Sequence, residues 1–188
     1  MRYVATRGAD PSAMPIGDIT YYGGFFEMVG EWAAQLSPLD VFETRHIVTV
    51  VFALAAYAAT WRMAASIGGE AAGALALLFL ALTPPFYGHA FNNPKDIPFA
   101  GTFALGAWAI LAARRGNREP GWRRLAVAGL AIGLAAGVRV AGLVLLGCAA
   151  TLWTGRVLIE ERERRARALV ELAPVSYTHL TLPTILRV

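Results

Sequence analysis

The chain has 188 residues, of which 56% are hydrophobic and only 16% carry charge. Soluble domains are about 45–50% apolar and about 25% charged, so the composition argues against a soluble protein. A single cysteine excludes a disulfide framework and a cysteine-based metal site. The net charge of +4 is not arranged as a basic stripe with interleaved aromatic residues, so we expect no nucleic-acid partner.

Residues 1–46 precede the first long apolar stretch and form a segment rich in acidic residues. Within residues 18–36, apolar side chains recur at helical spacing on one face, and Glu27 and Glu31 lie on another. This pattern predicts an amphipathic helix that lies in the membrane interface with an aromatic anchor. Its apolar face is formed by Tyr22, Phe25, Phe26, Val29, Trp32 and Leu36.

Four apolar stretches follow, and a helix needs about 20 mostly apolar residues to cross a bilayer. They cover residues 47–67, 71–87, 97–113 and 125–155. The last stretch is too short for two full crossings, and we interpret it as a short hairpin that turns near residues 137–142; a single long span is the alternative. Its glycines, spaced four residues apart, favour close helix packing. The sequence therefore predicts an all-α, polytopic transmembrane helical bundle with one interfacial amphipathic helix.

Arginine-rich segments indicate the orientation of these spans. Residues 114–124 contain five arginines and one glutamate, and residues 155–168 contain five arginines and three glutamates. Because short cytoplasmic loops carry an excess of Lys and Arg, we assign both segments, and the basic region 156–174, to the cytoplasm. The loop 84–97 and the acidic segment 1–46 are then expected on the outer face.

The two ends of the chain look atypical. The final segment, residues 175–188, breaks the compositional pattern and resembles translated sequencing-adapter read-through, so we exclude it from the functional reasoning. The chain starts within an extramembrane segment without a preceding span. We therefore expect a fragment of a longer protein that is inactive alone.

The outer loop at residues 83–100 concentrates polar residues in an otherwise apolar chain. Asn93 followed by Pro94 is typical of a helix start, with asparagine as the cap and proline at the first helical position. Lys95 adds a positive charge where exposed amides and the helix dipole already attract an anion. The alternative is that Asp96 complements the dipole and Lys95 extends to the headgroups. The polar set is His89, Asn92, Asn93, Lys95 and Asp96.

Arg139 is the only charged residue in the fourth apolar stretch. A charge in such a stretch indicates a functional site, here a second cation for a phosphate, and the alternative is an ion pair with an outer carboxylate. A carboxylate of the first segment could serve as general base, with Asp18 and Asp10 as candidates. The alternative role for Asp18 is to cap the interfacial helix. Arg45, which opens the first span, is expected to be an interfacial anchor.

The order of these features resembles a known family. An acidic outer segment, "RH" at the start of a span, "LTPPFYGHAFNNPKDIPFA" at an outer turn and "GLAIGLAAGVRVAGL" follow one another over residues 18–155. This arrangement is similar to the ArnT-like and protein-mannosyltransferase-like membrane glycosyltransferases of the GT-C fold (glycosyltransferase families 39 and 83). Such enzymes move a sugar, with inversion, from a polyprenyl-phosphate carrier to a lipid, glycan or protein hydroxyl on the outer face of the membrane.

The resemblance assigns roles to residues of this chain. Asp18 would be the catalytic base, with Asp10 as the second choice. Lys95 and Arg139 would bind the carrier phosphate, and Asp96 would orient Lys95 or support a divalent metal, which some family members bind. No other cofactor is expected. His89, Asn92 and Asn93 would support the site. The expected location is the bacterial inner (plasma) membrane.

A transporter or flippase for an anionic lipid or solute is the main alternative, because intramembrane arginines and proline-broken helices occur there too. An internal repeat would favour transport, and the spans show none. A non-catalytic membrane scaffold is a third reading, which gives the polar loop and Arg139 no purpose.

Overall fold

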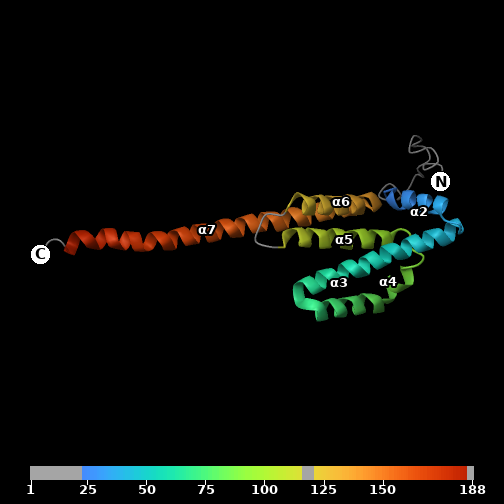
Figure 1. The fold of residues 1–188 in the computed structure, drawn as a ribbon, viewed down its shortest axis with the longest axis horizontal. Coiled ribbons are helices and arrows are strands. Elements are labelled where there is room, and N and C mark those ends of the chain that lie inside the picture. Colours follow the sequence, from blue (N-terminus) through green and yellow to red (C-terminus); the bar gives the residue numbers. More distant parts are fainter. Residues whose placement is uncertain (1–22, 116–120, 186–188) are drawn as a thin grey trace, which may run out of the picture. The chain divides into compact units, whose positions relative to one another are not determined.

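The computed structural model describes residues 23–115 and 121–185. All regular elements in these ranges are helices, as predicted. The chain divides into two compact units, Met1–Leu146 and Gly147–Val188. The helices, labelled in Figure 1, are α2 (Phe25–Leu36), α3 (Val41–Leu82), α4 (Pro84–His89), α5 (Asp96–Arg114), α6 (Trp122–Val138), the 3-10 helix η3 (Val140–Leu143) and α7 (Val144–Ile185).

Three segments of the described chain are long and apolar enough to cross a membrane: Val41–Leu82, Asp96–Arg114 and Val140–Glu163. Helix α6 of the first unit has 17 residues and lies at the short end of the range for a span. The prediction of a polytopic helical membrane fold is therefore confirmed.

Helix α3 folds back on itself at Gly69, whose φ of 82° and ψ of 178° are non-helical. A positive φ strains any residue with a β-carbon, so glycine is needed at this position. Residues 41–68 form the first arm and residues 70–82 the second arm. The arms pack closely, because a β-carbon at Gly73 would lie 2.6 Å from the Trp61 side chain. The predicted spans 47–67 and 71–87 lie along these arms and α4, with a break at Thr83.

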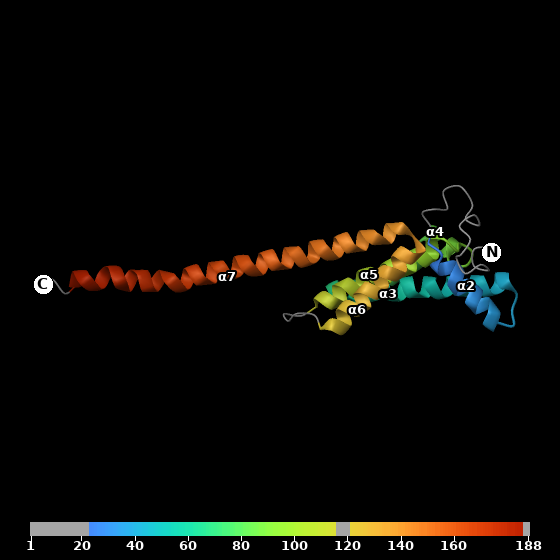
Figure 2. The same ribbon diagram turned by 90° about the horizontal axis from the view of Figure 1, so that it is seen from above.

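Helix α5 lies between the first arm of α3 and α6 (Figures 1 and 2). Small residues allow this close approach: a β-carbon at Gly101 would lie 2.4 Å from the carbonyl oxygen of Phe52. Buried alanines line the same contacts, including Ala53 and Ala56 of α3 and Ala109 of α5. Packing in this unit thus depends on small side chains that bring backbones together.

Helix α6 ends at Val138, and Arg139 is extended, with φ −153° and ψ 136°. The chain then turns back and packs tightly against α6. A β-carbon built at Gly142 would lie only 2.4 Å from the carbonyl carbon of Ala135, so glycine is needed for this close approach. Gly106 of α5 likewise meets the Leu145 side chain, whose nearest atom lies 2.6 Å from a β-carbon built at Gly106. The break places Arg139 at the end of α6.

The expectation that regularly spaced glycines of α6 mediate close packing is wrong for two of the three. A β-carbon at Gly129 or Gly133 would meet nothing within 4 Å in the described structure. Only Gly137 has a neighbour, the Phe25 β-carbon at 3.3 Å. Spacing alone identified a stripe of small residues, but the close contacts are made where α5 crosses α3 and where the chain reverses at Gly142.

An amphipathic helix, α2, is present in the first segment, and it begins at Phe25. Phe26 is buried and its ring centroid lies 6.1 Å from that of Phe52, so the helix packs against α3. Trp32 and Leu36, predicted on the same apolar face, are exposed. They lie near the end of the helix, where no other described element covers them, and suit contact with lipid.

Helix α7 belongs mainly to the second unit. Beyond its apolar part it carries i,i+4 ion pairs, Arg156 with Glu160 at 2.6 Å and Arg165 with Glu161 at 2.5 Å. Such pairs support an exposed helix that leaves an apolar environment. The helix continues to Ile185, through most of the final segment of the sequence.

Candidate functional site

The start of α5 is built by Asn93. Its Oδ1 accepts hydrogen bonds from the backbone N–H groups of Lys95, at 3.1 Å, and Asp96, at 3.0 Å. Its Nδ2 donates to Oδ2 of Asp96 at 3.0 Å. Asn93 thus satisfies two donors of the first turn while it orients the Asp96 carboxylate. Helix α5 begins at Asp96 with Lys95 as its N-cap residue, so the prediction that Asn93 is the cap and Pro94 the first helical residue is wrong by two residues. Asn93 instead holds the turn that leads into the helix.

The loop that carries these residues is anchored in the core. Ala90 and Ile97, which flank it, are buried against Ala53 of α3, with Phe52 and Phe86 packed around them. The carbonyl of His89 accepts hydrogen bonds from the backbone N–H groups of Asn92, at 3.2 Å, and Asn93, at 3.0 Å. The polar turn is therefore anchored in the core at both ends, and this anchoring restricts where its polar side chains can lie.

Arg139 reaches this turn across 43 residues of sequence. Its Nη2 donates to Oδ1 of Asp96 at 2.8 Å, and its guanidinium carbon lies 5.4 Å from the centroid of the Phe99 ring. The Arg139 side chain is 27% exposed and that of Asp96 is 59% exposed. The guanidinium is thus fixed by a charged partner and an aromatic face, and it remains accessible from outside.

The structure brings Arg139 to the same end of α5 as Lys95, which is the direct neighbour of Asp96 in sequence. Lys95 and Arg139 bring two formal positive charges, and Asp96 one formal negative charge, to this end of α5. Because Asn93 and Arg139 each hold one oxygen of Asp96, the carboxylate is locked in place. We name Asn93, Lys95, Asp96 and Arg139 the Asp96 cluster.

The other predicted site residues fall into two groups, those that the structure describes and those outside the described residues. His89 ends α4 and Asn92 lies in the turn after it, and both are exposed. Asp10 and Asp18 lie outside the described residues. Among the residues that are described, no three His, Cys, Asp or Glu side chains come together to hold a metal ion. Asp96, the carboxylate assigned a supporting role, is engaged by Arg139 and Asn93.

Sequence reasoning missed two contacts made at α2, one with the start of α3 and one with the end of α6. Arg45 forms an ion pair with Glu27, and its guanidinium carbon lies 5.7 Å from the Phe26 ring centroid. The sequence did contain evidence for the first contact, because Glu27 lies on the polar face of the predicted interfacial helix and was available to pair with a cation. At the start of α2, the N–H of Gly23 donates to the Val138 carbonyl at 2.9 Å. This hydrogen bond places Gly23 at the end of α6, next to the residue that precedes Arg139.

The fold and the cation-bearing cluster define a membrane-embedded protein with a polar site at the end of a span. The family of dolichyl-phosphate-mannose-protein mannosyltransferases matches residues 33–182. No curated protein and no solved structure matches the chain. The family match and the candidate spans identify the class as multi-pass membrane glycosyltransferases.

The chain belongs to the dolichyl-phosphate-mannose-protein mannosyltransferase family. The family resemblance inferred from the polar loop and the Arg139 segment is confirmed, because the matched residues include both. The match begins at residue 33, so it does not include Asp10 or Asp18.

Proposed function

We propose that the protein transfers a sugar from a polyprenyl-phosphate carrier to a hydroxyl of a lipid, glycan or protein, with inversion, at the outer face of a bacterial inner membrane. Family membership supports the reaction class. The observation that carries the proposal for this chain is the ion pair between Arg139 and Asp96, which holds a guanidinium at the end of a candidate span, at the residue that follows Lys95 in sequence.

The charge change in such a reaction explains why two cations suit the site. The acceptor oxygen forms a bond to the anomeric carbon while the bond from that carbon to the carrier phosphate breaks. The donor phosphate is a diester with one negative charge, and the released polyprenyl phosphate carries more. Arg139 and Lys95 would stabilise the charge that develops on the leaving oxygen, and a fixed guanidinium does so without reorganisation.

The acceptor proton must also be removed as the new bond forms, and we assign this role to Asp18, with Asp10 as the second choice. Gly23 is hydrogen-bonded to Val138, next to Arg139. Asp18 is five residues before Gly23, so chain length alone limits the distance between their backbones to about 18 Å. Asp10 is thirteen residues away, and the chain constrains it much less.

The orientation follows from charge. We propose that the Asp96 cluster and residues 1–46 lie outside, and that residues 114–124 and 156–174 lie in the cytoplasm. A position at the outer end of a span would let a prenyl tail remain in the bilayer while the phosphate and sugar meet the polar loop.

The test uses protein expressed from the complete reading frame and reconstituted in proteoliposomes. A panel of radiolabelled polyprenyl-phosphate sugars would be supplied, and loss of sugar from the carrier would be measured. We expect turnover with at least one carrier and, for Arg139→Gln, a rate lower by a factor on the order of 100. Asp18→Asn should be similarly impaired, and Lys95→Gln should show a smaller loss.

Arg165→Gln is the matched control, because it removes an ion-paired arginine of α7 far along the chain from the cluster. Its rate should equal that of the unmodified protein. Equal turnover by the control, Arg139→Gln and Lys95→Gln would contradict the site. Absence of turnover with every carrier, together with transport of one across the bilayer, would contradict the reaction.

A further inference from the structure

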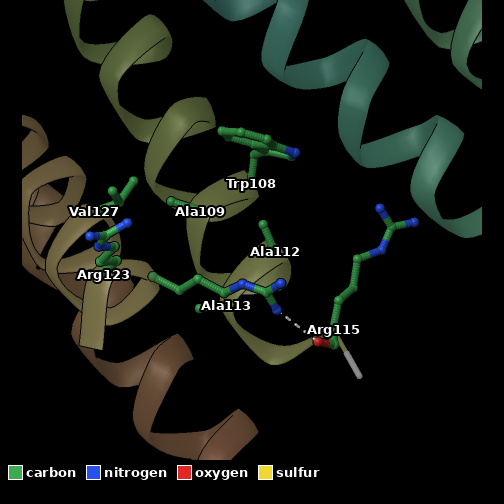
Figure 3. A pocket seen from close by; sticks show the side chains of 8 residues that line it. Trp108, Ala109, Ala112, Ala113, Arg115, Arg123 and Val127 are labelled. Atoms are coloured by element: carbon green, nitrogen blue, oxygen red, sulfur yellow. Dashed lines mark hydrogen bonds between the residues drawn. The ribbon is translucent and has the colours of Figure 1, made fainter. Parts of the chain in front are cut away.

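The opposite end of α5 from the Asp96 cluster carries a pocket that the proposed transfer reaction does not use. Asp96 and Arg114 are the first and last residues of a 19-residue helix, so the two ends are separated by about 27 Å. The pocket lies between α5 and α6 and has a volume of about 490 Å³ (Figure 3). It is lined by Trp108, Ala109, Ala112, Ala113, Arg115, Arg123, Arg124 and Val127.

The lining combines an apolar floor with three cations. Four of the lining residues are alanines or valine, and the described lining contains no carboxylate. Figure 3 shows Arg115 and Arg123 on two sides of Ala112, with the Trp108 ring above. A surface that pairs positive charge with a small apolar floor complements a ligand that has an anionic head and an apolar body.

Backbone carbonyls hold two of the three arginines in place. Nη2 of Arg115 donates to the Ser66 carbonyl of α3 at 2.8 Å. Nη1 of Arg124 donates to the Arg115 carbonyl at 3.2 Å, the dashed line in Figure 3. The carbonyls at a helix end carry only partial negative charge, so these bonds orient the guanidinium groups without neutralising them.

Aromatic residues indicate the depth of this end in a membrane. The Trp122 side chain, at the start of α6, is 74% exposed, and the Arg123 guanidinium carbon lies 5.6 Å from its ring centroid. Exposed tryptophans next to arginines are typical of the headgroup region. The excess of arginine in residues 114–124 assigns this interface to the cytoplasmic side.

We propose that this pocket binds the phosphate headgroup of an anionic phospholipid from the inner leaflet. Arg123, with the carbonyl-held Arg115 and Arg124, contacts the phosphate, and the alanine floor contacts the upper part of an acyl chain. Basic pockets between membrane helices on the cytoplasmic side are suited to such headgroups. The lipid would brace α5 against α6 at the end where the helices are not joined by an ion pair among the described residues.

The test is native mass spectrometry of the purified protein, which counts lipids retained after exchange into phosphatidylglycerol or phosphatidylcholine. We expect retention of phosphatidylglycerol and not of phosphatidylcholine. Arg123→Gln should weaken phosphatidylglycerol binding by about fivefold. Ala112→Trp, which fills the pocket without a change of charge, should abolish it.

Arg62→Gln is the matched control. Arg62 also lies over a neighbouring tryptophan, with its guanidinium carbon 5.5 Å from the Trp61 ring centroid, and it does not line the pocket. The Arg62→Gln variant should bind phosphatidylglycerol as strongly as the unmodified protein does. Equal losses in Arg62→Gln and Arg123→Gln would show general charge attraction and overturn the proposal. Equal retention of phosphatidylcholine, full binding by Ala112→Trp, or displacement of the lipid by millimolar inorganic phosphate would also overturn it.

Discussion

The two ends of α5 hold positive charge in different ways. At the Asp96 end, Arg139 is paired with a carboxylate that Asn93 also fixes, so the cations are partly balanced. At the Arg114 end, Arg115 and Arg124 are held by backbone carbonyls, and the described lining contains no carboxylate. The first arrangement gives precise geometry with little net charge, which suits a reacting phosphate. The second gathers more positive charge among the described residues and holds it by neutral carbonyls, which suits a headgroup.

Gly101→Val should produce the largest loss of stability, because it disturbs the packing of α5, whose two ends carry the Asp96 cluster and the pocket. A β-carbon there would lie 2.4 Å from the Phe52 carbonyl oxygen, so α5 would have to move away from α3. Overpacking of this kind costs about 1–3 kcal/mol, measurable as a lower Tm in detergent. Gly133→Val is the control, since nothing lies within 4 Å of a β-carbon there. Equal losses in both variants would contradict the packing described for α5.

Arg139→Lys should separate the two ends, because it keeps the charge and loses the planar fork that faces Asp96 and Phe99. We expect polyprenyl-phosphate binding to weaken by about tenfold, a difference of about 1.4 kcal/mol. Phosphatidylglycerol retention at the Arg114 end should not change. Isothermal titration with polyprenyl phosphate gives the affinity, and an unchanged value would show that charge alone is sufficient at the Asp96 end.

Asn93→Ala should remove the two hydrogen bonds that Asn93 accepts at the entry to α5, as an asparagine cap would, and one of the two contacts that hold Asp96. Loss of an asparagine cap costs about 1 kcal/mol of unfolding free energy. We expect a small decrease in Tm and weaker polyprenyl-phosphate binding. Asn92→Ala, which alters the neighbouring exposed amide, serves as the control. If the two variants bind the phosphate equally well, Asn93 does not position the carboxylate.

Glu27→Gln should have the smallest effect and should spare both ends of α5. It breaks the ion pair with Arg45, in which the Glu27 side chain is 51% exposed. Exposed pairs contribute about 0.2–1 kcal/mol, so the Tm should fall slightly, and less at high salt. A large loss of sugar transfer in this variant would mean that α2 takes part in the site.

The sequence was sufficient for features that depend on local composition and spacing. The apolar spans follow from nearby residues alone, and so does the alternative that Arg139 forms an ion pair with a carboxylate. It could not specify which carboxylate Arg139 would meet. That choice depends on where α6 ends and how α5 packs beside it, so it involves contacts 43 residues apart in sequence.

Other features escaped prediction for the same reason. The glycines at 129 and 133 have the spacing of a packing motif, but their contacts depend on which face of α6 turns to α5. The pocket at the Arg114 end exists because the end of α5 and the start of α6 converge, and Arg115 reaches Ser66 of α3. Residue spacing within one helix carries no information about such convergence.

The central claim is that Asp96 acts by positioning Arg139 for an anionic carrier. A double-mutant cycle on polyprenyl-phosphate binding tests this claim most directly, with Asp96→Asn, Arg139→Gln and the combination of both. We predict that each single variant binds more weakly and that the double variant binds no more weakly than Arg139→Gln. Losses that simply add in the double variant, or unchanged binding by Arg139→Gln, would contradict the account.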